Sequence, residues 1–154
     1  MKSINNNVTS YKSWDELIYK KGRKDFPLIL FNNFFEISPE EWPRAISDAW
    51  IIPEWPGQVA PAYGWITLFE YCGYIVDEER VERADDLPEL LTLYRGAIPK
   101  YRRGLAWTSD IKKAKFFANR FNSTSDKQGV VWKVTVPREL VLARFTDRNE
   151  SDIY

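Results

Sequence analysis

Hydrophobic and polar positions alternate most regularly in the second half of the chain. From Val130 to Val136, Val and Trp side chains occupy every second position, with Lys133 and Thr135 between them. This alternation predicts a strand that is buried on at least one face. Shorter apolar runs predict four further strands, at residues 90–94, 104–109, 141–145 and 150–154.

One helix is predicted among these strands. Asp110 is a suitable N-cap residue, and the apolar positions after it recur at the spacing of a single helical face. These positions are Ile111, Ala114, Phe117, Ala118 and Phe121.

The first half of the chain carries mainly helical signals. Ser13–Glu16 and Ser38–Glu41 both have the Ser-x-x-Glu form of a capping box, so a helix should follow the start of each. Pro39 would then occupy the first position of the second helix, and Pro43 would lie deep enough to distort that helix.

Three other segments of the first half have less regular patterns. Trp65–Tyr74 predicts a helix with Gly73 near its end. Leu28–Phe35 is apolar and aromatic, which is typical of a strand or a buried loop edge. Asp77–Asp86 is net acidic and predicts a solvated helix or a linker.

These elements predict an α+β fold in one domain over residues 1–154. The helical, Trp-rich front covers residues 1–88, and the strand-rich back covers residues 89–154. A chain of 154 residues buries enough surface to fold without a disulfide or a metal.

The composition removes several classes of chemistry. The chain has no His, and Cys72 is its single Cys. A Ser-His-Asp triad, a Cys-His dyad and a His-ligated zinc site are therefore excluded, and no metal is expected. Catalysis would have to use carboxylates, hydroxyls, Lys, Arg, Tyr or a cofactor.

The net charge is zero, but the two signs are unevenly spread. Residues 1–90 carry 9 basic and 16 acidic side chains, and residues 91–154 carry 13 basic and 6 acidic ones. A basic half suits a phosphate-bearing ligand or a nucleic acid, although the two halves could simply neutralise each other. Residues 1–10 are polar and the longest apolar run is Phe26–Phe31, so we expect no signal peptide, no membrane partner and a cytoplasmic protein.

Three segments of the back carry candidate chemistry. They are Tyr94-Arg95-Gly96 at a strand end, Leu105–Asp110 running from a strand into a helix, and Arg148–Ile153 running from a loop into a strand. Each has an ordinary structural explanation when taken alone: a surface cation, a helix cap and a solvated acidic edge.

Together, their order and spacing resemble the Arg–Ser–Glu class of ADP-ribosyltransferases, especially small phage-type and bacterial members. The resemblance covers about residues 90–154. It implies a split, mostly antiparallel β-sandwich core with a helical N-terminal part packed on it, and NAD as substrate. The resemblance also implies a phage or prophage protein in the host cytoplasm that transfers ADP-ribose to a host macromolecule, either a protein target or a nucleic acid, and so disarms host machinery such as host defence.

The resemblance also implies roles for particular residues. Arg95 would bind the pyrophosphate of NAD through its planar fork of donors, with Gly96 allowing close backbone approach. Thr108, with Ser109 second, would brace the acid and the ribose, and Tyr94 or Trp107 would stack on a ring of NAD. The remaining roles fall on Glu150 and Asp152 as catalytic acids, and on Phe145 and Arg148 for recognition of the target.

The sequence departs from the family pattern at two places. Asp152 stands where the family usually has Glu, so either the backbone compensates, or Glu150 takes the catalytic role, or activity is lost. In the hydroxyl motif, one register aligns Ala106 with the first Ser of the family, and the other register aligns Trp107 with it.

Two functions of other classes therefore stay open. In one, the fold is kept, the site is degenerate, and an exposed apolar patch of Trp side chains within residues 42–65 docks on a protein partner. In the other, the basic half binds nucleic acid, although no zinc, helix-turn-helix or RNA-recognition signature accompanies it. The enzyme hypothesis instead requires Arg95, Thr108 and Glu150 or Asp152 to converge in one cleft.

Overall fold

The computed structural model describes residues 10–53, 56–120, 128–146 and 152–153, the last two as backbone. The fold is mixed α and β, as expected. The chain forms two compact units, Met1–Val59 and Ala60–Tyr154. The sequence pattern changes from helical to strand-rich after residue 88. This change is not the boundary between the two units, because the second unit begins at Ala60.

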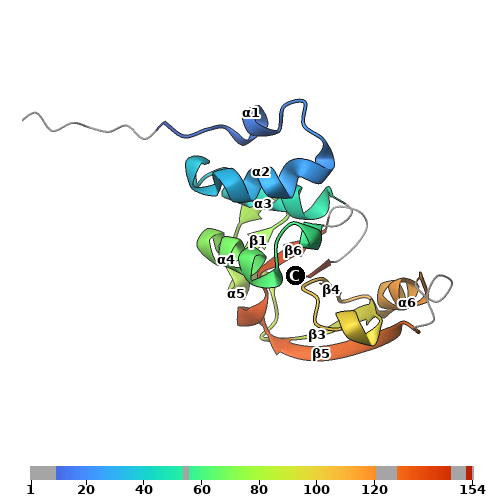
Figure 1. Cartoon of the computed structure of the whole chain (residues 1–154). Helices are drawn as coiled ribbons and strands as arrows, with labels where there is room; N and C mark the ends of the chain where they lie inside the picture. The colour runs from blue at the N-terminus through green and yellow to red at the C-terminus, as the bar shows by residue number, and fades with distance from the viewer. Residues whose placement is uncertain (1–9, 54–55, 121–127, 147–151, 154) are drawn as a thin grey trace, which may run out of the picture. The chain divides into compact units, whose positions relative to one another are not determined.

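The first unit is helical. Its elements are α1 (Trp14–Ile18), η1 (Arg23–Asp25), α2 (Phe26–Asn33), η2 (Phe34–Glu36), α3 (Trp42–Ile51) and η3 (Pro56–Gln58) (Figure 1). The prediction of a strand or loop edge at Leu28–Phe35 is wrong, because most of this segment is α2. A run that is apolar on nearly every side has no helical period, so the pattern alone could not separate helix from strand.

Both predicted capping boxes differ from the structure. Ser13 is the N-cap of α1 but forms no side-chain capping bond, and the Trp14 nitrogen donates to the Glu41 carboxylate instead. The second helix begins at Trp42 rather than at Pro39, so Pro43 lies in its first turn, where the missing N–H costs nothing. Pro43 therefore does not distort the helix.

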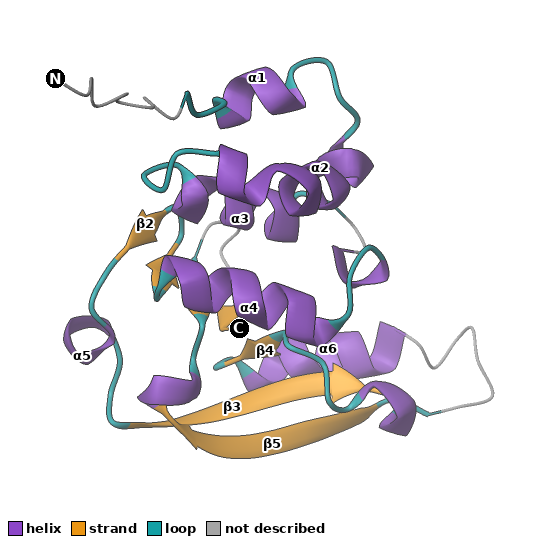
Figure 2. Ribbon diagram, turned by 60° about the vertical axis from the view of Figure 1, so that its left-hand side comes forward, coloured by secondary structure: helices purple, strands orange, loops and turns teal. Residues whose placement is uncertain are grey.

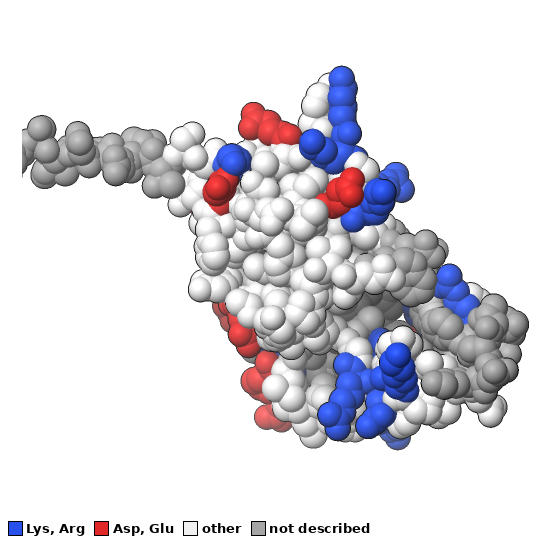
Figure 3. Space-filling view, in the orientation of Figure 1, with Lys and Arg blue, Asp and Glu red and all other residues white. Residues whose placement is uncertain are grey.

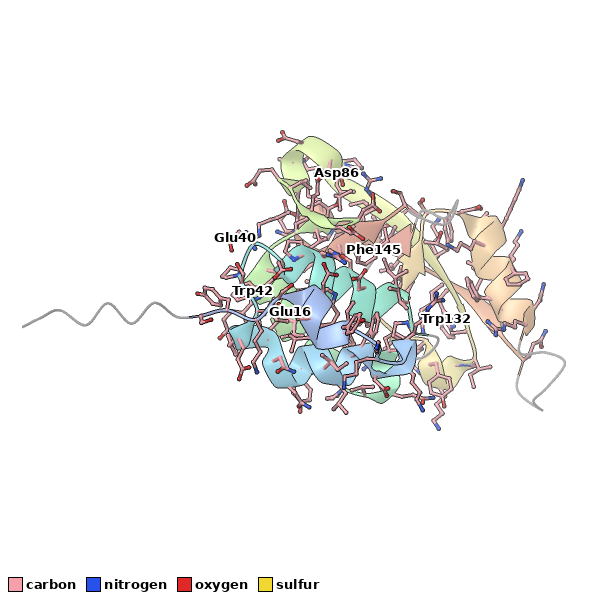
Figure 4. The ribbon with its side chains drawn as sticks, turned by 90° about the horizontal axis from the view of Figure 1, so that it is seen from above. Glu16, Glu40, Trp42, Asp86, Trp132 and Phe145 are labelled. Carbon is pink, nitrogen blue, oxygen red and sulfur yellow. The ribbon has the colours of Figure 1, made fainter. Side chains whose placement is uncertain are left out.

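Two tryptophan side chains, Trp14 and Trp42, pack within the first unit. Trp14 is fully buried and donates from Nε1 to Asp48 at 2.9 Å. Trp42 (labelled in Figure 4) stacks on Phe34 with 4.5 Å between ring centroids and donates to the Phe34 carbonyl at 3.0 Å. These residues hold α1, η2 and α3 together, which is a structural role rather than a docking role.

The second unit contains the sheet. Its helices are α4 (Ala62–Cys72), α5 (Arg83–Asp86), η4 (Pro99–Tyr101), α6 (Ile111–Arg120) and η5 (Arg138–Leu140). Its strands are β1 (Ile75–Val76), β2 (Glu79–Arg80), β3 (Leu90–Ala97), β4 (Trp107–Thr108), β5 (Val130–Pro137), β6 (Ala143–Phe145) and β7 (Asp152–Ile153). The predicted helices at 65–74 and after Asp110 are confirmed, as is the strand at 130–136.

The described strands pair continuously in the order β2-β1-β6-β7-β4-β3-β5. Neighbouring strands are antiparallel except β1 and β6, which are parallel. The acidic segment at 77–86 contains the turn between β1 and β2, the strand β2 and the short helix α5, none of whose residues is buried, so the prediction of a solvated helix holds only for its last four residues.

The two faces of β3 have different neighbours. α6 packs along β3 and β5 on one face (Figure 2). Alternate residues of β3 point to opposite faces, so Leu91 and Leu93 lie on the other face. There they belong to an apolar cluster with Tyr74, Leu87 and Val141, against which Trp107, Val134 and Val136 also pack.

Among the described residues, no helix is long and apolar enough to cross a membrane.

A polar cluster fixes α5 to the inner strand β6 of the sheet. The Asp86 carboxylate (labelled in Figure 4) accepts from Arg144 Nε at 3.0 Å, from Arg144 Nη2 and from the Tyr74 hydroxyl. Burial alone would raise the pKa of Asp86, but the bonds from Arg144 and Tyr74 outweigh burial and lower this pKa. Burial, and then Asp86 itself, raises the pKa of Tyr74, which keeps its hydroxyl a donor.

Asp86→Asn should lower the free energy of unfolding at neutral pH by about 2 kcal/mol, because it leaves the Arg144 charge without its partner. The pKa of Asp86 is lower in the folded state, so its contribution is present above the unfolded pKa of about 3.9 and is lost as pH falls through the folded pKa. Urea unfolding across pH should show the two proteins converging in acid. Asp15→Asn is the control, because it removes an exposed ion pair with Arg44, and it should change the free energy of unfolding little. An equal loss of stability in both variants would contradict the stabilising role given to the Asp86–Arg144 pair.

Candidate functional site

Arg95 lies on the apolar-cluster side of β3, near the end of the strand. Its Nε donates to the Tyr101 carbonyl at 3.1 Å, and its Nη1 donates to the Ala106 carbonyl at 2.7 Å. Both acceptors belong to the segment that joins β3 to β4. The two bonds fix the plane of the guanidinium relative to the sheet.

Gly104 makes room for this arrangement. A Cβ at residue 104 would lie within 3.0 Å of the Arg95 guanidinium, so the side chain packs directly over the glycine backbone. The connecting segment therefore holds Arg95 both by hydrogen bonds and by close packing.

Two tryptophans flank Arg95 on the same face. Arg95 is the register partner of Trp132 on β5, and in the antiparallel register of β3 with β4 it lies opposite Trp107. Trp132 (labelled in Figure 4) donates from Nε1 to the Ala97 carbonyl at 3.0 Å, and Trp107 donates to the Gly104 carbonyl at 2.9 Å. Both rings are half-buried, so this face presents a fixed cation between two fixed indoles.

Tyr94 and Thr108 belong to the opposite face. They are register partners, and strand alternation places them on the side of β3 that α6 covers. Thr108 is buried, and its hydroxyl accepts from the Asp110 nitrogen at 3.1 Å, where it helps to start α6. The described geometry therefore does not bring Thr108 to Arg95, so the predicted convergence of Arg95, Thr108 and an acid is wrong for Thr108.

The register also shows which residue of β4 accompanies Arg95. Trp107 shares its face, whereas Thr108 does not. Ser109 is exposed after the end of the strand.

The strand β7, which contains Asp152, lies beside β4. The backbone of Asp152 on β7 is in register with Thr108 on β4 and with Phe145 on β6. Glu150 and Arg148 lie outside the described residues. Phe145 (labelled in Figure 4) is a strand residue that is 4% exposed, so it does not present its ring to a target as expected from the sequence.

Gly96 has a different purpose from the one expected. A Cβ at residue 96 would lie within 3.0 Å of the Ala114 carbonyl oxygen and the Ala118 nitrogen of α6. The glycine therefore permits close packing of the helix on the sheet. It does not open the backbone toward a ligand on the face of Arg95.

Two residues that help to order this unit carry no clear signal in the sequence. The alternation of residues 130–136 places Trp132 on a strand face but indicates no role for it, because its position opposite Arg95 depends on long-range register. Asp77 accepts from both the nitrogen and the hydroxyl of Thr146 at 2.7 Å and so fixes the end of β6. Its signal was obscured by the acidic residues around it.

Comparisons of this chain with protein-family models, with curated proteins and with solved structures gave no match. Within the described parts of the chain, no group of three or more Cys, Asp or Glu side chains is placed to hold a metal ion.

Proposed function

We propose that the second unit is an ADP-ribosyltransferase-like enzyme that uses NAD, with a site that contains Arg95 and the acidic residues but not Thr108, which lies on the other face of β3. One observation carries the proposal: the three segments with the family resemblance form the adjacent strands β3, β4 and β7, in the sheet order β7-β4-β3. Sequence spacing alone does not require this, since two strands, a helix and a loop separate β4 from β7. The proposal includes a core of the ADP-ribosyltransferase type, a split and mostly antiparallel β-sandwich.

In the proposed complex, Arg95 binds the pyrophosphate of NAD. A guanidinium whose plane is already fixed loses little freedom on binding, which favours affinity. Trp107 and Trp132 offer ring faces on either side of it for nicotinamide or adenine.

The proposed reaction breaks the bond between nicotinamide and the C1′ carbon of the ribose. Nicotinamide leaves with the bonding electron pair, and an oxocarbenium-like cation forms at C1′. A carboxylate of Asp152 or Glu150 stabilises this cation, and for Asp152 this requires the carboxylate to reach the face of Arg95 although its backbone is in register with Thr108. The acceptor then forms the new bond to C1′ and releases its proton to the other carboxylate or to water.

Incubation with NAD labelled in its adenylate phosphate, alone and with bacterial lysate, tests this function. We expect release of nicotinamide and a labelled macromolecule, both at least about 100-fold weaker in a Glu150→Ala/Asp152→Ala variant that keeps its melting temperature. Turnover that is equal in the two proteins would contradict the role of the acids.

A catalytically degenerate, NAD-binding protein that inhibits a protein partner is the second candidate. The observation that favours it is that Trp107, and not the Thr108 hydroxyl, shares the face of Arg95. This candidate predicts saturable NAD binding without nicotinamide release from the folded wild-type protein. The Trp-rich docking patch that it was expected to use is not seen in the described part of residues 42–65, where Trp42 and Trp50 are half-buried and Trp65 is fully buried.

A further inference from the structure

The turn between β3 and β4 concentrates positive charge beside Arg95. Lys100, Arg102 and Arg103 are all exposed, and none of them forms an ion pair in the described structure. From Leu90 to Ser109 the sequence contains no Asp or Glu. Figure 3 shows Lys and Arg side chains gathered at the place where Figure 1 draws η4.

This basic turn is held in a defined conformation. The Tyr101 carbonyl accepts from Arg95, and Arg102 Nη1 donates to the Pro99 carbonyl at 2.9 Å. The charges are therefore carried on a preorganised backbone, which reduces the entropic cost of binding a ligand.

An aromatic ring accompanies the charges. Tyr101 is 56% exposed, and the Lys100 ammonium lies 5.3 Å from its ring centroid. An exposed ring among unpaired cations suits a ligand that alternates flat bases with phosphates. An acidic protein surface would use the charges but would leave the ring without a partner.

From these contacts we propose that the turn formed by Lys100, Tyr101, Arg102 and Arg103 binds single-stranded nucleic acid. The cations contact successive phosphates, and an unstacked base lies on Tyr101. Double-stranded nucleic acid should bind less well, because its bases are already stacked on each other and are not available to the Tyr101 ring. Binding does not require NAD. One extension rests on the proposed function: if the protein transfers ADP-ribose, the bound strand is the acceptor.

The test is a titration of the full chain, without NAD, into a labelled DNA strand about 12 nucleotides long. Three phosphate contacts predict that the logarithm of the binding constant falls with the logarithm of salt concentration with a slope of about −2. Lys100→Gln/Arg103→Gln should reduce the slope to about −0.7 and weaken binding more than about tenfold at low salt. Lys112→Gln/Lys115→Gln removes two exposed charges from α6 in the same unit and should change neither quantity.

Two further probes separate nucleic acid from other polyanions. Tyr101→Ala should weaken binding of the strand by about tenfold while leaving binding of an abasic strand of equal length unchanged. Equal affinity for the normal strand, the abasic strand and polyglutamate would overturn the proposal in favour of an acidic protein partner. An absence of binding at low salt, or an equal loss in the α6 variant, would also overturn it. A failure of the NAD assay would not, because no step of this titration uses NAD.

Discussion

Gly96→Ala should destabilise the 154-residue protein by about 3 kcal/mol, which corresponds to a melting temperature about 6–12 °C lower. The added methyl group would collide with the Ala114 carbonyl oxygen and the Ala118 nitrogen, which are backbone atoms of α6 and cannot rotate away. To accept it, α6 must move off the sheet and lose its packing on β3. Thermal unfolding by circular dichroism measures the effect.

Gly57→Ala is the matched control, because a Cβ at residue 57 would meet nothing within 4 Å. It should leave the melting temperature unchanged or raise it slightly. If Gly96→Ala instead keeps its full stability and loses NAD binding, Gly96 serves the ligand and the packing explanation is wrong.

Arg95→Lys should reduce kcat/KM for NAD by about 100-fold, although the charge is kept. Lys cannot reproduce the planar fork that donates to two carbonyl oxygens and that presents a fixed edge to a pyrophosphate. A misplaced cation would bind the pyrophosphate less well and would not hold NAD in the orientation from which nicotinamide leaves. Steady-state kinetics of nicotinamide release give this value, and calorimetry gives the accompanying loss of affinity.

Arg103→Lys is the control for this substitution. Arg103 is exposed and makes no hydrogen bond in the described structure, so the same chemical change there should leave NAD kinetics unaltered. If Arg95→Lys lowers only the melting temperature and keeps normal NAD kinetics, Arg95 is a structural residue of the β3–β4 connection.

The parts of the fold that follow from local signals could be predicted. Asp110 caps α6 as expected, with the Lys112 nitrogen donating to its carboxylate at 2.8 Å. The strand at 130–136 followed from alternation. The helix α2 could not be predicted in this way, because its apolar residues have no period, although Pro27 in its first turn was a usable signal.

The candidate site was predictable in its residue types but not in its geometry. Arg95 and Thr108 looked like partners in the sequence, yet they lie on opposite faces because Tyr94, not Arg95, is in register with Thr108. A shift of register by one residue would reverse this result, and no local pattern in a two-residue strand fixes the register. Long-range pairing also decides that Trp132 flanks Arg95.

The central claim is that the face of Arg95 between Trp107 and Trp132 binds NAD. The most direct measurement is an NMR titration with NAD that follows the indole N–H signals of the seven Trp side chains, with two signals assigned by Trp107→Phe and Trp132→Phe. We expect these two signals to shift saturably below about 1 mM NAD, while Trp14 and Trp42 of the first unit stay in place. No shift of Trp107 and Trp132 at that concentration, or a shift confined to Trp14 and Trp42, would contradict the account.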